Sequence, residues 1–361
     1  MNFNFTDEQQ QFRDALRRYL DREYTFDARQ KIVASQQGVD AKHWSAFAEL
    51  GLLALPVPEA QGGFDGGPVD MLVVMQELGR ALVVEPYWAT VVGIEALKIA
   101  SYDEGLMERA ARGELRLSVA FNEPHSRYDL FDMQTIANEN GKLNGIKSMV
   151  QHGAQADYWI VPARHHNEVK LYLVERDESV ITEYRTIDGQ RAATLTFRDT
   201  SATQIAGAEA LEKVADYATF LLCAEALGAL DALNHATVEY TKARQQFGQP
   251  IARFQALQHR MVEMLIHAEQ ARSITYLAAA RYTSDDPATR ARAISAAKAR
   301  VGQAARFVGQ QAIQLHGGMG VTNEVAAAHW FKRLSIVENT LGDVDHHLAR
   351  FASLTKMETS E

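Results

Sequence analysis

Two glycine-containing stretches in the C-terminal half decide the fold: Arg244-Gln-Gln-Phe-Gly-Gln-Pro-Ile251 and Gln314-Leu-His-Gly-Gly-Met-Gly320. Each follows a long segment with helical periodicity, so we expect both at helix ends. A planar guanidinium and bare glycine backbone at a helix end can bind an anionic ligand. Read singly, each stretch has an ordinary alternative, namely a solvated arginine at a helix C-terminus and a glycine helix stop.

The surrounding sequence predicts a bundle. Apolar residues recur with helical spacing over four long segments with short connections, approximately 212–246, 253–284, 287–315 and 323–354. Long helices with short connections favour an antiparallel four-helix bundle.

Upstream of the bundle the periodicity changes twice. Residues 1–114 are predicted to be helical, with Thr6 capping a first helix that carries Leu16 and Leu20 on one face. Period-two patterns between 115 and 208 predict short strands, near 115–121, 142–150, 158–162, 169–174, 180–185 and 193–197. Asn140-Gly and Asn144-Gly are expected to form hairpin turns. The prediction is a mostly α chain with a central β domain: an N-terminal α-helical domain (1–114), a middle β domain (115–208) and a C-terminal four-helix bundle (209–361).

Composition excludes several classes of protein. The chain has 361 residues, more than one core normally organises, and 37 Lys and Arg against 46 Asp and Glu give a net charge of −9. This balance argues against nonspecific nucleic-acid binding. No run approaches the roughly 20 apolar residues of a membrane span, and we expect no signal peptide. The single cysteine, Cys223, is expected to be a buried apolar side chain, and we expect a cytoplasmic protein without nucleic-acid or membrane partners.

Over essentially its whole length the sequence resembles the acyl-CoA dehydrogenase family of flavoproteins. The resemblance is carried by Tyr240–Met264, which is similar to that family's C-terminal signature, and by Gln311–Glu324, which is similar to its second flavin-contacting motif. Within the family the chain most resembles the small subunits of pimeloyl-CoA dehydrogenases, through Ser126–Asp129, Phe331–Leu334 and Gly342–Leu348.

The resemblance implies FAD held between the β domain and the bundle, with contacts that cross a subunit interface. The residues implied on the bundle side are Arg244, Gln246, Phe247, Gln255, Gln314, Gly317 and Gly318. It also implies an acyl-CoA substrate that is converted to a trans-2-enoyl-CoA and an electron-transfer flavoprotein as acceptor. The assembly is expected to be a homodimer or homotetramer, or a heterotetramer with a homologous large subunit.

The β-domain flavin motif departs from the family pattern. The usual Thr-Glu-Pro-Gly-Ala-Gly-Ser-Asp stands here as Asn122-Glu-Pro-His-Ser-Arg-Tyr-Asp129, and Trp-Ile-Thr stands as Met149-Val-Gln151. Asn122 and Gln151 are still expected to hydrogen-bond flavin. The glycine-lined approach and the stacking tryptophan are missing, which predicts weakened flavin binding or an empty half-site. Arg127 and Tyr128 fill that glycine space, where they could pair with a CoA phosphate or a substrate carboxylate or form a simple salt bridge.

The family's catalytic base is also displaced. Leu341-Gly-Asp343 aligns with the position that usually holds the glutamate, and a second base position used by some members falls near Ala218. The nearest carboxylates are Glu338, three residues before Leu341, and Glu225, two helical turns after Ala218. Both are candidate bases, and a structural ion pair is the alternative for each.

Polar residues gather near the end of the sequence. Asp343, His346 and His347 share a helical face and superficially resemble a metal site, but we expect a helix-end polar cluster and no metal.

The leading hypothesis is a flavin-dependent acyl-CoA dehydrogenase subunit. The alternatives are a non-catalytic structural subunit that completes a partner's FAD site and a flavin monooxygenase on the same fold.

Overall fold

The computed structural model describes residues 5–102 and 105–358, which divide into two compact units. The first contains Met1–Arg29, Pro68–Val83 and Thr219–Glu361, and the second contains Gln30–Gly67 and Val84–Ala218. The mostly α fold with a central β domain is confirmed. The proposed boundaries at 114 and 208 stay a prediction.

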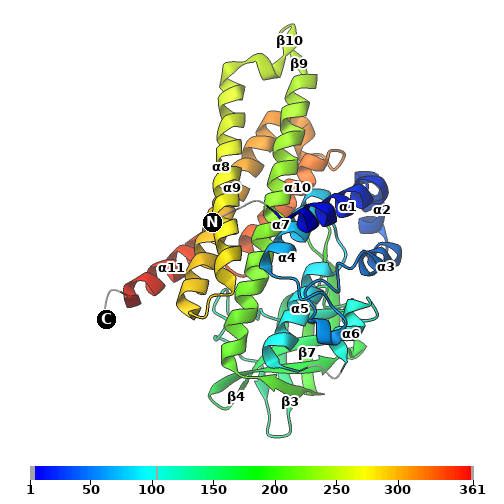
Figure 1. Cartoon of the computed structure of the whole chain (residues 1–361), viewed down its shortest axis with the longest axis vertical. Coiled ribbons are helices and arrows are strands. Elements are labelled where there is room, and N and C mark those ends of the chain that lie inside the picture. The colour runs from blue at the N-terminus through cyan, green and yellow to red at the C-terminus, as the bar shows by residue number, and fades with distance from the viewer. Residues whose placement is uncertain (1–4, 103–104, 359–361) are drawn as a thin grey trace. The chain divides into compact units, whose positions relative to one another are not determined.

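The first unit is built around long helices. Its elements are α1 (Asp7–Glu23), α4 (Pro68–Ala81), α7 (Ala208–Ala243, from Thr219 onward), α8 (Gln255–Tyr282), α9 (Pro287–His316), α10 (Ala326–Asn339), α11 (Val344–Glu358), the short strands β9 (Gln245–Gln246) and β10 (Gln249–Pro250), and the 3-10 helices η3 (Ile251–Arg253) and η4 (Gly317–Val321). The hairpin of β9 and β10 connects the adjoining ends of α7 and α8 (Figure 1). The predicted cap at Thr6 is confirmed and forms a capping box, because the Thr6 hydroxyl accepts from the amide of Gln9 while the Gln9 side chain accepts from the amide of Thr6.

Glycines allow α4 and α7 to approach closely. A Cβ at Gly79 would collide with the carbonyl of Glu225, and one at Gly228 would collide with the carbonyl of Gln76. The contact therefore requires the absence of a side chain at both positions. It places Glu225 in the interior of this unit.

The last predicted helix, 323–354, is wrong as a single element. The structure has two helices, α10 and α11, separated by a turn in which Leu341 and Gly342 have φ values of 57° and 114°. A positive φ lies outside the right-handed helical region, so an α-helix cannot continue through this turn. Two side chains elsewhere in the unit hold the turn: His347 contacts the carbonyl of Leu341, and Lys298 donates to that of Gly342.

The second unit combines short helices with a sheet. Its elements are most of α2 (Phe26–Ala34), α3 (Ala41–Glu49), η1 (Glu59–Gln61), α5 (Tyr87–Ala100), α6 (Leu106–Ala111), β1 (Leu117–Val119), β2 (Ile136–Ala137), β3 (Lys142–Gln151), β4 (Tyr158–His165), β5 (Glu168–Glu175), η2 (Glu178–Val180), β6 (Ile181–Arg185), β7 (Arg191–Ser201) and β8 (Thr203–Ala206). The strand order is β6-β7-β3-β2-β4-β5-β8, and β1 pairs in parallel with β4.

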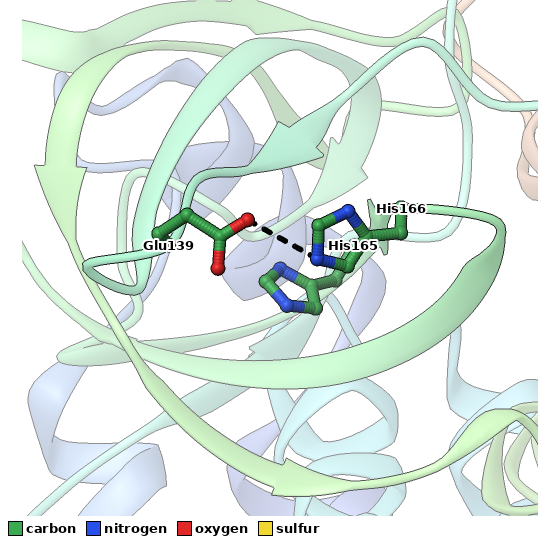
Figure 2. Close-up of side chains that lie close together, drawn as sticks. All are labelled: Glu139, His165 and His166. Carbon is green, nitrogen blue, oxygen red and sulfur yellow. Dashed lines mark ion pairs between the residues drawn. The ribbon is translucent and has the colours of Figure 1, made fainter.

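One of the two predicted Asn-Gly turns is confirmed. Asn140-Gly lies in the turn between β2 and β3, beside the turn between β4 and β5 (Figure 2). Asn144-Gly is instead inside β3, where the pairing with β7 shifts register at Gly145, so the turn prediction there was wrong. Gly145 has a φ of 147° and packs against Thr135, which leaves no room for a Cβ.

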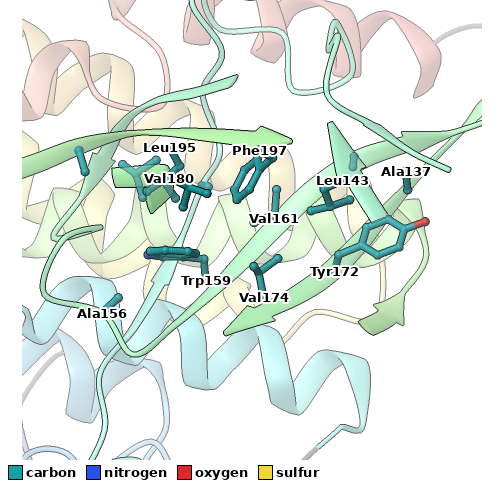
Figure 3. Packing of buried hydrophobic residues seen from close by; sticks show 14 of the residues in the cluster. Ala137, Leu143, Ala156, Trp159, Val161, Tyr172, Val174, Val180, Leu195 and Phe197 are labelled. Atoms are coloured by element: carbon teal, nitrogen blue, oxygen red, sulfur yellow. The ribbon is translucent and has the colours of Figure 1, made fainter. Parts of the chain in front are cut away.

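The β domain has an apolar core on one side of its sheet. Trp159, Val161, Leu143, Leu195 and Phe197 are buried there and point toward one another (Figure 3). The indole Nε1 of Trp159 donates to the carbonyl of Gly153 at 2.7 Å, so its one polar atom is satisfied. The alternating pattern of the predicted strands is the source of this core.

Two further expectations bear on the class of protein. Cys223 is fully buried as expected, and burial raises the pKa of its thiol to about 12, so it is inert at neutral pH. None of the helices in the described ranges is long and apolar enough to cross a membrane.

Candidate functional site

An open pocket of about 720 Å³ lies at the end of the bundle that carries both glycine-containing stretches. It is lined by Tyr240, Arg244, Gln246, Ile251, Leu257, Arg260, Gln314, Leu315, His316, Gly317, Gly318 and Met319. Helix α7, the β9–β10 hairpin, the first turns of α8 and the end of α9 therefore meet at one place. The structure brings together five of the seven residues that the sequence predicts here: Arg244, Gln246, Gln314, Gly317 and Gly318.

The local backbone fixes Arg244 at the exit of α7. Its amide donates to Tyr240 at 2.8 Å, and its carbonyl accepts from Ile251 at 2.8 Å, which closes the hairpin. Neither Arg244 nor Arg260 forms a salt bridge within residues 5–102 and 105–358. Two exposed guanidinium groups without carboxylate partners give the pocket a positive charge.

One wall of the pocket contains bare glycine backbone. Helix α9 ends at His316, and Gly317 follows with φ 59° and ψ −139°, a conformation suited to glycine. A Cβ at Gly317 or Gly318 would meet no protein atom within 4 Å, so both positions open onto space. The rings of Tyr240 and His316, which also line the pocket, stack with centroids 4.4 Å apart.

His316 is a fixed part of this wall. Its Nδ1 lies 2.8 Å from the Ala312 carbonyl, its own carbonyl accepts from the Tyr240 hydroxyl at 3.1 Å, and burial lowers its pKa. The ring is therefore neutral and donates to Ala312. A rigid wall of this kind presents the glycine backbone in one orientation.

These residues fit the diphosphate of a dinucleotide. Diphosphates are bound by the forked guanidinium groups of arginines, by side-chain amides and by uncovered glycine backbone. The other two predicted bundle residues do not line the pocket. Phe247 is 91% exposed at the tip of the hairpin, where its ring packs edge-on against Phe254, and Gln255 is exposed at the start of α8.

Sequence reasoning did not single out Arg260. It lies three residues after Leu257 on the first turns of α8, and residues with this spacing share a helix face. That spacing, together with the position of Leu257 beside the hairpin, is the signal that could have found it. Both side chains line the pocket.

In the β domain, Glu123 anchors the loop that carries Asn122. Its carboxylate accepts from the amides of Gln134 at 2.6 Å and Thr135 at 3.1 Å and from Lys147 at 2.7 Å. Burial opposes ionisation, but Lys147 and these hydrogen bonds outweigh it and lower the pKa of Glu123. The glutamate of the altered motif is therefore a structural ion, held almost fully out of solvent.

The residues that replace the family's flavin-stacking segment are held by their backbones. Met149 has a φ of 51°, is 41% exposed, and donates its amide to the Tyr184 hydroxyl at 2.9 Å. Asn122 and Gln151 are half-buried, and their carbonyls accept from Ser148 and Ser118. Their amide side chains stay predicted flavin contacts. Arg127 is exposed with a φ of 46°, in place of a glycine of the family motif.

Glu225, the first candidate base, is held in a buried ion pair. Arg333 donates Nε to one carboxylate oxygen at 2.6 Å and an Nη to the other at 2.7 Å, and both side chains are buried. Proton abstraction by Glu225 would require this bidentate pair to break. The geometry thus favours the structural alternative, and its role as a base stays a prediction.

Glu338, the second candidate, lies at the end of α10. Its side chain is 8% exposed and pairs with Arg306, whose own side chain is 61% exposed. Its carbonyl accepts from Lys298 at 2.9 Å. Because the partner is an exposed arginine at the surface, Glu338 can be released more easily than Glu225.

The turn after Glu338 is a helix-end polar cluster, as expected. Asp343 accepts from the amide of His346 at 2.9 Å, as helix-capping residues do. His347 is buried between the Ser295 hydroxyl and the Leu341 carbonyl, so both ring nitrogens have protein partners. Lys298, which the sequence analysis missed, is buried in α9 and bonds to the carbonyls on both sides of the turn.

Comparisons with known proteins agree with this architecture. Residues 205–352 match the family model of the acyl-CoA dehydrogenase C-terminal domain, and residues 6–101 match that of the N-terminal domain. A protein named acyl-CoA dehydrogenase IpdE2 from Mycobacterium tuberculosis is 30% identical over 304 residues, which cover 83% of this chain and 82% of that protein.

Two solved structures are similar along the whole chain. One, titled "Tcur3481-Tcur3483 steroid ACAD G363A variant", has a TM-score of 0.92 and 26% identity and covers 98% of this chain and 99% of that one. The other is the ChsE4-ChsE5 complex from Mycobacterium tuberculosis, with a TM-score of 0.90, 23% identity and 99% coverage of both chains. The chain belongs to the acyl-CoA dehydrogenase family.

Proposed function

We propose that this chain is one subunit of a heteromeric FAD-dependent acyl-CoA dehydrogenase and that its bundle end completes a FAD site shared with a homologous partner. The observation that carries the proposal is a contrast within the bundle. The pocket at Arg244 keeps exposed cations that form no salt bridge with any residue the structure describes, beside open glycine backbone. The turn that aligns with the family's base position instead presents Leu341, held in place by buried polar groups.

The bundle residues would bind the diphosphate of FAD. Arg244 and Arg260 supply charge, and Gln246 and Gln314 supply amides that can hydrogen-bond the ribose or phosphate oxygens. FAD, when bound, accepts the hydride that leaves the β-carbon of the substrate. The phosphate contacts of this chain position the cofactor and take no part in proton transfer.

If this chain catalyses the dehydrogenation without a partner, its base is Glu338 rather than Glu225. Removal of the α-proton of the thioester requires a carboxylate that can approach the substrate carbon. Arg306 is an exposed side chain that can swing away from Glu338, whereas Arg333 holds both oxygens of Glu225 in the interior. In the heteromer, the homologous partner supplies the carboxylate.

The substrate class is an acyl-CoA with a bulky or carboxylated acyl group. The structural neighbour whose title names a steroid enzyme supports a bulky group, and the ChsE4-ChsE5 neighbour, a complex by its title, supports the pairing with a second chain. The proposal includes electron transfer to an electron-transfer flavoprotein. It also includes a cytoplasmic location, which is consistent with a single, buried cysteine.

The test is the visible spectrum of the chain alone and co-purified with its homologous partner, before and after anaerobic addition of acyl-CoA thioesters. We expect flavin in the complex, and bleaching of its band by the substrate. Arg244→Ala should weaken flavin binding about tenfold to a hundredfold, because a hydrogen bond to a charged group contributes about 1.5–3 kcal/mol. Arg281→Ala, an exposed arginine near the end of α8 that does not line the pocket, is the matched control.

Two results would contradict the proposal. Flavin occupancy of the complex that is unchanged by Arg244→Ala would remove the bundle pocket from the FAD site. Bleaching of flavin in the chain alone, abolished by Glu338→Gln, would show a self-sufficient enzyme and overturn the need for a catalytic partner.

A further inference from the structure

Two turns of the β domain bring together three side chains that can bind a metal ion. Glu139 lies in the turn between β2 and β3, His165 ends β4, and His166 begins the turn that leads to β5. Strand β2 pairs with β4 at Ile136 and Arg164, so both turns lie at the same edge of the sheet. Figure 2 shows the three side chains directed toward one another.

The distances are close to those of a coordination sphere. Nε2 of His166 lies 3.1 Å from a carboxylate oxygen of Glu139, and one ligand atom from each of the three residues lies within 4.8 Å of the others. A tetrahedral ion with bonds of about 2.0–2.1 Å places its ligand atoms about 3.3 Å apart. The side chains of Glu139 and His166 are 76% and 69% exposed, so they are free to make this small adjustment.

The hydrogen bond that His165 makes through Nδ1 is typical of metal-binding histidines. Its Nδ1 lies 3.2 Å from the carbonyl of Ala137, an arrangement in which the Nδ1 hydrogen is donated and Nε2 keeps its lone pair. Histidine ligands of metals are commonly oriented by such a bond from the other ring nitrogen. The β2 strand therefore orients the ring of His165 for a ligand outside the sheet.

The donor set selects the class of cation. Two imidazoles and one carboxylate suit Zn²⁺ and the neighbouring first-row ions, whereas Mg²⁺ and Ca²⁺ require a shell of oxygen ligands. Three protein ligands leave the fourth position of a tetrahedral ion to water. Within residues 5–102 and 105–358 these three residues are the one group of acidic, cysteine and histidine side chains with this spacing.

We propose that Glu139, His165 and His166 bind a divalent transition-metal ion, with Zn²⁺ as the representative cation. The ion would fasten the β2–β3 turn to the β4–β5 turn, in addition to the ion pair between Glu139 and His166. Binding to the folded state alone stabilises a protein in proportion to the logarithm of ligand concentration over the dissociation constant. Zinc is thus expected to raise the unfolding temperature of the chain.

The experiment uses the full-length chain, freed of metal by chelator and titrated with ZnCl₂ in a calorimeter. We expect one zinc ion per chain, and we expect His166→Gln to weaken its binding at least about tenfold, since even the loss of an outer partner costs about ten- to a hundredfold. His235→Gln removes an exposed histidine of α7, distant in sequence from the two turns, and is the matched control. Co²⁺ in place of zinc should give a visible absorption band that His166→Gln abolishes.

The unfolding temperature provides the second readout. Zinc should raise it in the wild-type chain and in His235→Gln but not in Glu139→Gln/His166→Gln, and Mg²⁺ should not raise it in any variant. Zinc that binds equally well to the double variant, or a chain that binds none at about 100 µM ZnCl₂, would overturn the proposal. The flavin content of the protein does not enter this test, so its result is independent of the proposed dehydrogenase function.

Discussion

Cationic side chains occur in two very different settings within the same bundle. Beside the β9–β10 hairpin, Arg244 and Arg260 line an open pocket and have no carboxylate partner among the described residues. In the interior, Arg333 and Lys298 are almost fully buried, where Arg333 donates to the carboxylate of Glu225 and Lys298 donates to the carbonyl of Glu338. A charge taken out of water must be paired, whereas an exposed charge that stays unpaired beside bare backbone is available to a ligand. The difference separates the side chains that hold the bundle together from those that are available to a ligand.

The largest effect is expected at the interior pair. Arg333→Met leaves the carboxylate of Glu225 buried without its bidentate partner. Breaking a buried pair in this way should lower the free energy of unfolding by about 3–5 kcal/mol. Urea denaturation of the wild-type chain and the variant measures the difference.

A double variant tests whether the pair is structural. Glu225→Leu/Arg333→Met removes both charges and should recover much of the lost stability, because a well-packed apolar pair avoids the cost of desolvation. A Glu225→Gln chain that stays as stable as the wild type but no longer bleaches flavin would contradict the structural role and restore Glu225 as a base.

Lys298 should show a smaller effect with a distinctive pH dependence. Lys298→Met leaves the carbonyls of Glu338 and Gly342 without their buried donor, which should cost about 1–3 kcal/mol near pH 7. Burial lowers the pKa of Lys298 to about 8, against the attraction of the Glu338 and Asp343 carboxylates. Between pH 8 and the ordinary lysine value of 10.5 the unfolded chain binds more protons than the folded one, so stability should rise with pH there. The variant should lack this rise when unfolding is measured at pH 7.5, 9 and 10.

His347 should make the same turn sensitive to acid. Burial, followed by the charges of Lys298 and His346, lowers its pKa to about 2. The folded chain therefore keeps His347 neutral while the unfolded chain protonates it below about pH 6.5, and stability should fall as the pH drops from 6.5 toward 2. His347→Gln can still donate to Leu341 and accept from Ser295, so it should lower the slope by about 1.4 kcal/mol per pH unit. An unchanged slope in thermal melts from pH 6.5 to 4.5 would contradict this assignment.

The sequence predicted the pocket at Arg244 better than the turn between α10 and α11, and the reason is physical. Arg244 and Gly317 lie in contiguous stretches, and helical periodicity alone places both stretches at helix ends. The partners of Glu225 and of the α10–α11 turn come from residues 108 and 44 positions away in the chain, Arg333 and Lys298, and no local pattern records such a contact. The metal-binding group in the β domain was missed for the same reason, since Glu139 meets His165 only through the pairing of β2 with β4.

The smallest effect on stability is expected at the open glycine backbone of the pocket. Gly318 carries no positive φ and a Cβ there meets no protein atom, so Gly318→Ala should leave the free energy of unfolding unchanged or raise it by up to about 1 kcal/mol. The new methyl group would project into the pocket and should weaken flavin binding in the assembled enzyme. Gly317→Ala is the contrasting variant, because the backbone at Gly317 has a φ of 59° and a ψ of −139°, which strain any other residue. This variant should weaken flavin binding and also lower the free energy of unfolding by about 1–3 kcal/mol. Thermal melts separate the two variants, and flavin retention on dialysis measures the site. If Gly318→Ala retained flavin as well as the wild type, the open backbone at this end of the bundle would not face the cofactor, and the exposed cations beside it would have to be assigned to another anion.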